Sequence, residues 1–126
     1  NVVVGTNLKE LGNKNFRYGH SKWLVIEADE WKASFLNYSP DITIITNIDK
    51  EHLDFYKNLS DVKKTFLKFV DKTKRGGSLI LNKNDKNLFS LKSPILKIAK
   101  KTESESCLVF RKKNRAEKNS PNSGRS

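Results

Sequence analysis

The chain has 126 residues and a mass of 14.5 kDa, with 36% hydrophobic and 31% charged residues. This size and composition allow one domain with a modest apolar core, and they exclude a large multidomain enzyme and a wholly disordered chain. The longest apolar runs, 23–26 and 42–45, are far shorter than the roughly 18 residues that a membrane helix requires, and no leader pattern is present. We therefore expect a cytoplasmic protein. The single cysteine, Cys107, excludes an internal disulfide and a paired-cysteine zinc site.

The first third of the chain predicts short strands. Residues 2–4 are β-branched and lie near glycines, which indicates one strand in irregular surroundings. The runs KWLVIEA (22–28) and DITIIT (41–46) are short, almost continuously apolar and rich in β-branched residues. Such runs are typical of strands that are buried on both faces of a parallel sheet. Residues 33–38 between them have room only for a short helix or turn, which Pro40 ends.

Helix and strand patterns alternate in the rest of the chain. A helix is expected over 60–73, with Ser60 as N-cap, apolar residues on one face and lysines on the other. Two glycines end it, and 78–82 reads as a third buried strand. Residues 84–89 predict a helical turn, and 95–99 a short edge strand. This order predicts an α/β fold, part of a three-layer, mostly parallel sheet with right-handed crossovers.

The end of the chain differs in composition from the rest. Residues 107–126 contain six Lys or Arg against one acidic residue, within a chain whose net charge is +11. They are rich in Asn and Ser and have no apolar periodicity. We therefore expect an ordered unit over 1–100 and a basic, disordered tail over 101–126. The charge itself favours anionic partners such as nucleotides, phosphorylated sugars or nucleic acid.

Chemistry-bearing residues follow two of the expected strands. In open parallel sheets, ligands gather beyond the carboxyl ends of the strands. Glu27 ends one buried run and His52 follows the next, so both are expected at one rim of the sheet. A carboxylate and an imidazole on neighbouring loops can coordinate a divalent cation, while phosphate oxygens and water fill its other positions. The spacing alone leaves open a helix-capping acid with a surface imidazole, or a carboxylate pair for glycoside hydrolysis.

Two motifs at this rim resemble those of a known family. EADEWKASFLNYSPDITIITNIDKEHLDFY is similar to the central, ATP-binding domain of the Mur ligases of peptidoglycan synthesis, with its paired motifs EADE…SFL and TNI…HLD. VGTNLKELGNKNFRYG before it and GGSLILNKND after it are similar to the flanking segments, so the resemblance covers about residues 2–85. It is strongest to the alanine-adding type and to its relative that recycles murein tripeptide. In that type the TFLKF stretch has no counterpart of the carbamylated lysine found in the other ligases.

The resemblance implies a reaction and a set of site residues. It implies that ATP and Mg²⁺ are used to join an amino acid, L-alanine in this type, to UDP-N-acetylmuramate through an acyl phosphate that the amine attacks. Glu27 and His52 match the family's magnesium ligands, which bridge the metal to the γ-phosphate and the carboxylate. Asn47 matches an asparagine on the nucleotide side of that pocket. Arg17 falls where the family's NAR-like stretch approaches the UDP-sugar.

The sequence also departs from the family pattern. Glu51 replaces the usual aspartate before the histidine, and Trp31 and Lys32 replace a small and an acidic residue after EADE. No GxxxxGK[ST] phosphate loop is present; in the family that loop lies upstream of the residue matching Asn1. We therefore expect a partial central domain without the phosphate-loop strand and helix, inactive alone and marginally stable.

Two other classes of protein stay open at this point. The basic charge fits a small nucleic-acid-binding protein, although no RNP-like or helix-turn-helix pattern is present. An inactive remnant of a ligase is compatible with the same motifs. Nucleic acid is thus an unfavoured partner, and the expected small-molecule partners are UDP-N-acetylmuramate and an amino acid.

Overall fold

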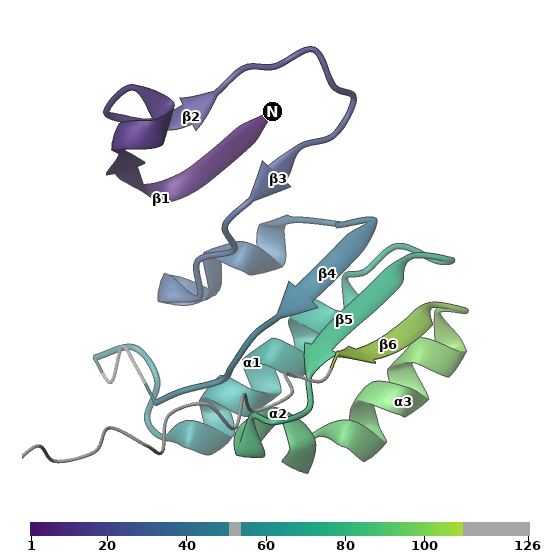
Figure 1. Ribbon diagram of the computed structural model, residues 1–126. Helices are drawn as coiled ribbons and strands as arrows, with labels where there is room; N and C mark the ends of the chain where they lie inside the picture. The colour runs from purple at the N-terminus through teal and green to yellow at the C-terminus, as the bar shows by residue number, and fades with distance from the viewer. Residues whose placement is uncertain (51–53, 110–126) are drawn as a thin grey trace, which may run out of the picture.

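The computed structural model describes residues 1–50 and 54–109, which form two three-stranded sheets with helices (Figure 1). The elements in chain order are β1 (Val2–Leu8), the 3-10 helix η1 (Lys9–Leu11), β2 (Lys14–Arg17), β3 (Val25–Ile26), the 3-10 helix η2 (Trp31–Asn37), β4 (Ile42–Ile45), α1 (Leu59–Asp71), β5 (Ser78–Asn82), α2 (Lys86–Ser90), α3 (Lys92–Lys101) and β6 (Glu105–Val109). One sheet has the order β2-β1-β3 and is called here the hairpin sheet. The other has the order β4-β5-β6 and is called the helix-backed sheet.

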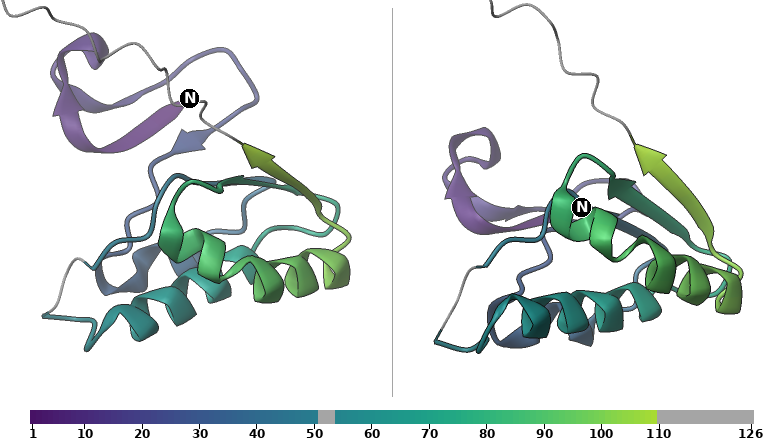
Figure 2. Two further views of the ribbon diagram at one scale, coloured as in Figure 1. Left: turned by 60° about the horizontal axis from the view of Figure 1, so that its bottom comes forward. Right: turned by 90° about the horizontal axis from the view of Figure 1, so that it is seen from below.

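The helix-backed sheet contains parallel pairs only, in agreement with the expected α/β fold. β5 lies between β4 and β6, with Ile45 opposite Leu81. Figure 2 shows α1 and α3 side by side against one face of this sheet. Side chains alternate along β4, so that Thr43 and Ile45 are buried beneath the helices while Ile44 on the other face is 62% exposed. The strands expected over 41–46 and 78–82 are confirmed, but the first is buried on one face only. The described residues therefore form a parallel sheet with helices on one face, as expected for part of a three-layer α/β domain.

The helix α1 has the apolar face expected from the sequence. Val62, Phe69 and Val70 are buried, and Phe66 packs against the same core. Its N-cap is Asn58 rather than Ser60: the Asn58 side chain accepts a hydrogen bond from the Asp61 amide at 3.0 Å. Asn58 has the extended backbone that a capping residue needs, which places its carboxamide oxygen over the first turn. The amphipathic pattern therefore predicted the helix, while its N-cap lies two positions earlier than expected.

The edge strand expected over 95–99 is wrong, because these residues belong to the helix α3. Ile95, Ile98 and Ala99 face the core at helical spacing, and Pro94 is tolerated because it lies in the first turn. The edge strand is β6, so the sheet continues past the boundary placed at residue 100. The remaining part of the expected tail, residues 110–126, lies outside the described residues.

The hairpin sheet is built differently from the helix-backed sheet. β1 pairs antiparallel with β2 and parallel with β3. None of its described residues is buried, and Val25 in β3 is 63% exposed. The expectation that 22–28 forms a strand buried on both faces is therefore wrong: only Val25–Ile26 is a strand, and it pairs with β1 instead of β4. The helices α1 and α3 lie against the other sheet, and Val25 and Ile26 of β3 face the space between the two sheets.

The short helix expected over 33–38 is observed as η2. Its Phe35 is buried, with ring centroids 5.2 Å from Phe66 and 4.6 Å from Phe69. This aromatic contact attaches the segment after β3 to the helix α1. None of the helices in the part of the chain that the structure describes is long and apolar enough to cross a membrane.

Candidate functional site

A groove of about 970 Å³ separates β3 from β4. Its walls are the apolar side chains of these two strands, and its ends carry charged and amide groups from the adjoining loops. Four acidic residues and one lysine line it: Glu27, Glu30, Asp41, Asp49 and Lys22. The groove is thus acidic within a chain whose net charge is +11, which favours a cationic or cation-bearing ligand.

Glu27 lies directly after β3 and is held by β1. Its backbone amide donates to the Val3 carbonyl at 2.9 Å, which continues the ladder between the two strands. The Gly5 amide donates to Glu27 Oε2 at 2.6 Å, so the carboxylate is oriented by a backbone group of the neighbouring strand. A Cβ on residue 5 would lie 3.3 Å from the same oxygen, which glycine avoids. The other oxygen, Oε1, has no hydrogen bond to the described residues and can coordinate a ligand.

Asn47 lines the same groove from the opposite side. It is the second residue after β4, at the carboxyl end of the strand, and it is exposed. The Thr46 hydroxyl donates to Asn47 Oδ1 at 3.0 Å. The structure therefore brings Glu27 and Asn47, which the sequence analysis singled out, to one groove although they belong to different sheets.

The other two predicted site residues are not at this groove as described. Arg17 lies at the exposed end of β2 and does not line the groove. His52 and the neighbouring Glu51 lie outside the described residues, so the expected pairing of Glu27 with His52 stays a prediction.

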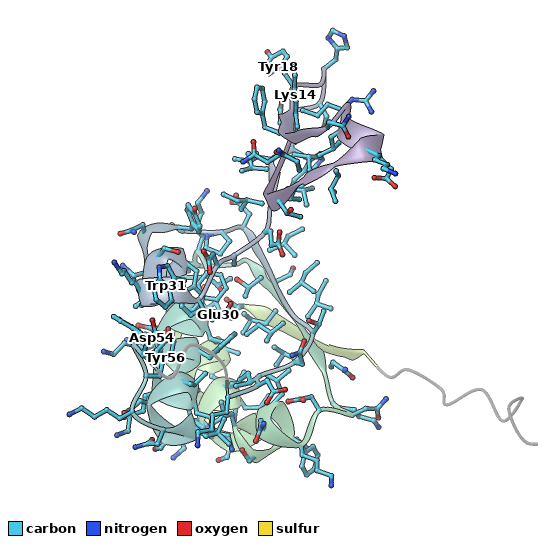
Figure 3. The ribbon with its side chains drawn as sticks, turned by 90° about the vertical axis from the view of Figure 1, so that its left-hand side faces the viewer. Lys14, Tyr18, Glu30, Trp31, Asp54 and Tyr56 are labelled. Carbon is cyan, nitrogen blue, oxygen red and sulfur yellow. The ribbon has the colours of Figure 1, made fainter. Side chains whose placement is uncertain are left out.

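Tyr56 joins the two loops that flank the groove. It is buried, and its hydroxyl donates to the Glu30 carbonyl at 2.6 Å, which ties the segment after β4 to the segment after β3. Figure 3 shows Tyr56 close to Glu30 and Trp31. Burial raises the pKa of the Tyr56 phenol above its ordinary value, and the negative charge of Glu30 raises this pKa further. The phenol therefore stays protonated and keeps its hydrogen bond at neutral pH.

The donors at the groove suit a hard cation that takes most of its ligands from elsewhere. The described residues contain no cluster of three His, Cys, Asp or Glu side chains that could hold a metal alone. Mg²⁺ in nucleotide sites is held by one or two carboxylates together with phosphate oxygens and water. The accessible Oε1 of Glu27 fits that arrangement as one protein ligand, and the amide oxygen of Asn47 is a further oxygen donor on the facing wall.

Sequence reasoning missed the residues that hold this site in shape. Gly5 and Tyr56 act through contacts 22 and 26 residues away in the chain. No local pattern reveals such contacts, because the first depends on β1 pairing with β3 and the second on the meeting of the segments that follow β3 and β4. The one available signal for Gly5 was its place inside a run that otherwise reads as a strand, which indicates a close approach of another group.

Comparison with known proteins agrees with the motifs. The family model described as the Mur ligase middle domain matches residues 11–123. This match reaches well beyond Asp85, where the resemblance seen in the sequence was placed. UDP-N-acetylmuramate--L-alanine ligases are similar to the chain: that of Clostridium novyi is 48% identical over 85 residues and that of Borrelia garinii subsp. bavariensis is 41% identical over 88 residues.

The coverage of these alignments is unequal. They include 68% and 70% of this chain but only 18% and 19% of the two relatives, so the chain spans about a fifth of the length of the proteins it matches. The matching family model, in contrast, covers most of the chain. The chain belongs to the Mur ligase family, and the part of that family it represents is the middle domain.

Proposed function

We propose that this chain provides part of the ATP and Mg²⁺ site of a ligase that joins L-alanine to UDP-N-acetylmuramate. The observation that carries the proposal is the groove between β3 and β4, which is lined by both the oriented carboxylate of Glu27 and the side chain of Asn47. The reaction is the one for which the similar ligases of Clostridium novyi and Borrelia garinii are named. ATP and the UDP-linked substrate place this reaction in the cytoplasm.

Each residue has a proposed role in that reaction. Glu27 would hold Mg²⁺ through Oε1, with His52 as second protein ligand. Asn47 would contact the nucleotide, and Arg17 the UDP-sugar. When bound, Mg²⁺ supplies positive charge between two anions that otherwise repel each other, the γ-phosphate and the muramate carboxylate. The carboxylate then accepts the phosphoryl group, and the alanine amine displaces phosphate from the acyl phosphate to form the amide bond.

A chimeric enzyme tests this proposal. The matching 85-residue segment of the Clostridium novyi ligase is replaced by the corresponding residues of this chain, and ADP release is measured with ATP, L-alanine and UDP-N-acetylmuramate. We expect an active chimera in which Glu27→Gln lowers kcat by about 100-fold, because it removes a charge that acts in the transition state.

Glu10→Gln is the matched control. It makes the same change at an exposed acidic residue of η1, outside the groove, and should leave kcat unchanged. A folded but inactive chimera would contradict the proposed function. An active chimera that tolerates Glu27→Gln would contradict the role of Glu27 alone.

A further inference from the structure

Three side chains near the end of β5 reach across to the loop that follows β4. They are Asn82, Asp85 and Asn87, called here the clamp. Asn82 is the last residue of β5, Asp85 is the N-cap of α2, and Asn87 lies in its first turn. All three are partly buried, and together they contact the backbone on both sides of Asn47.

The contacts of the clamp bracket Asn47. Asn82 Nδ2 donates to the Thr46 carbonyl at 3.0 Å, which fixes the residue before it. Asn87 Nδ2 donates to the Ile48 carbonyl at 2.7 Å, which fixes the residue after it. Asp85 Oδ1 accepts from the Leu88 amide at 2.8 Å as a helix cap, and the Ile48 amide points to the same oxygen at 3.4 Å. The hydrogen bonds of the two asparagines to the loop are shorter than the contact of Asp85 with it.

These side chains give hydrogen bonds to backbone groups that lie beyond the end of the β4–β5 pairing. The ladder between β4 and β5 ends at Ile45 and Leu81, so the following backbone groups need other partners. Ile48 is almost fully buried in the core, which makes an unpaired carbonyl there expensive. Asn47 itself is exposed, and its side chain accepts a hydrogen bond from the hydroxyl of the neighbouring Thr46. Its position therefore depends on its two anchored neighbours.

We propose that the clamp residues Asn82 and Asn87 are positioning residues for Asn47, with Asp85 holding Asn87 through the helix cap. The inference rests on the proposed function, in which Asn47 contacts the nucleotide. It adds that the clamp residues, at the end of β5 and the start of α2, fix the position of Asn47 for this contact.

The first measurement needs no ligand. Asn87→Asp keeps the shape of the side chain but replaces the amide donor by an acceptor, and Asn82→Ser shortens the other donor. By NMR, each variant should raise the amide exchange rate of Ile48 about tenfold, because the loop that loses a hydrogen bond at the Thr46 or Ile48 carbonyl opens more often and then exposes the Ile48 amide, which otherwise points to Asp85 Oδ1. The side-chain couplings of Asn47 should also change from a single rotamer to an average. Asn15→Asp is the matched control, since Asn15 is exposed on β2.

The amides of β5 report whether each variant is folded. Protected Leu79 and Leu81 amides with a fast Ile48 amide would support the clamp. Unchanged Ile48 exchange and unchanged Asn47 couplings in both variants would overturn the proposal, whatever the chain binds.

The second measurement asks whether the clamp acts through Asn47. ATP with Mg²⁺ is titrated into the chain, into Asn47→Ala, into Asn87→Asp and into the double variant. We expect each single change to weaken binding several-fold and the double change to weaken it no further, because both remove the same contact. Fold-changes that multiply would overturn the proposal, since Asn87 would then act independently of Asn47. If the unaltered chain binds ATP and Asn47→Ala leaves the affinity unchanged, the nucleotide role is contradicted, and the NMR measurement alone decides whether the clamp positions Asn47.

Discussion

The two sheets of this molecule have equal numbers of strands but make unequal contributions to its stability. The helix-backed sheet contains the buried residues of β4 and β5 and the helices that cover them. The hairpin sheet has no buried residue among those described. The candidate site nevertheless takes Glu27 from the end of the hairpin sheet and Asn47 from the end of the helix-backed sheet. Stability and site geometry therefore arise from different parts of this fold.

This difference follows from what covers each sheet. α1 and α3 remove one face of the helix-backed sheet from water, which is the main source of stabilisation in a small domain. The hairpin sheet is held by strand pairing and by a few loop contacts, and such regions are expected to open with a small free energy. Glu27 is accurately oriented by Gly5 but lies in the less stable half.

The largest expected effect is a core truncation in the helix-backed sheet. Leu79 in β5 is 0% exposed, so Leu79→Ala should lower the free energy of unfolding by about 2–5 kcal/mol through lost burial and a cavity. Phe16 in the hairpin sheet is 56% exposed, and Phe16→Ala should change it by about 0.5 kcal/mol or less. Urea unfolding followed by circular dichroism measures both. Equal effects would show that the two sheets contribute alike and would contradict the comparison.

A second comparison uses one glycine from each sheet. A Cβ at Gly77, beside β5, would lie 2.6 Å from the Asp41 carbonyl oxygen and 2.8 Å from that of Lys74, so backbone must move. Gly77→Ala should lower the free energy of unfolding by about 1–3 kcal/mol. Gly5→Ala meets only the Glu27 carboxylate at 3.3 Å, and this side chain can shift. We expect a loss of about 0.5 kcal/mol or less there. A Gly5→Ala effect as large as that of Gly77→Ala would mean that the hairpin sheet is rigid.

These two sheets also show where sequence reasoning succeeded. α1 was predicted within a few residues from its apolar periodicity, and β4 and β5 from short runs of apolar, β-branched residues. The prediction of a strand over 95–99 failed, because a short apolar run fits either a strand or a buried helix. These residues form a helix, in which Ile95, Ile98 and Ala99 share one face.

The site itself was only partly accessible from the sequence. Glu27 and Asn47 were found because strand ends in parallel sheets collect ligands, and because the motifs resemble a family. Their placement in different sheets was not found, since KWLVIEA looks like a core strand whether or not another element covers it. Gly5, Tyr56 and Asn87 escaped notice because each acts through one hydrogen bond to a distant backbone or carboxylate group.

A third prediction concerns the N-cap of α1, the principal helix behind β4. Asn58→Ala removes the acceptor of the Asp61 amide and should lower the free energy of unfolding by about 1 kcal/mol. Ser60→Ala, at the cap position favoured by the sequence, should change it by a few tenths of a kcal/mol, because Asn58 is the residue that caps. Thermal melts of the two variants measure the two losses of stability. A larger loss for Ser60→Ala would show that Ser60, and not Asn58, caps the helix.

The last prediction concerns a pH-dependent change in stability and the hydrogen bond of Tyr56, which links the two halves of the molecule. Tyr56→Phe removes the hydrogen bond to the Glu30 carbonyl and should lower the free energy of unfolding by about 1 kcal/mol near neutral pH. The pKa of Tyr56 is raised above 10 by burial and by Glu30, so the native phenol keeps its proton at a pH where the unfolded one has lost it. The stability that the tyrosine contributes is therefore complete below pH 10 and falls as the pH rises through the native pKa. The difference between the unaltered chain and Tyr56→Phe should shrink in that range, whereas lysine titration is common to both and cancels. A constant difference for Tyr56→Phe would mean that the phenol is in contact with water and does not hold the two loops together.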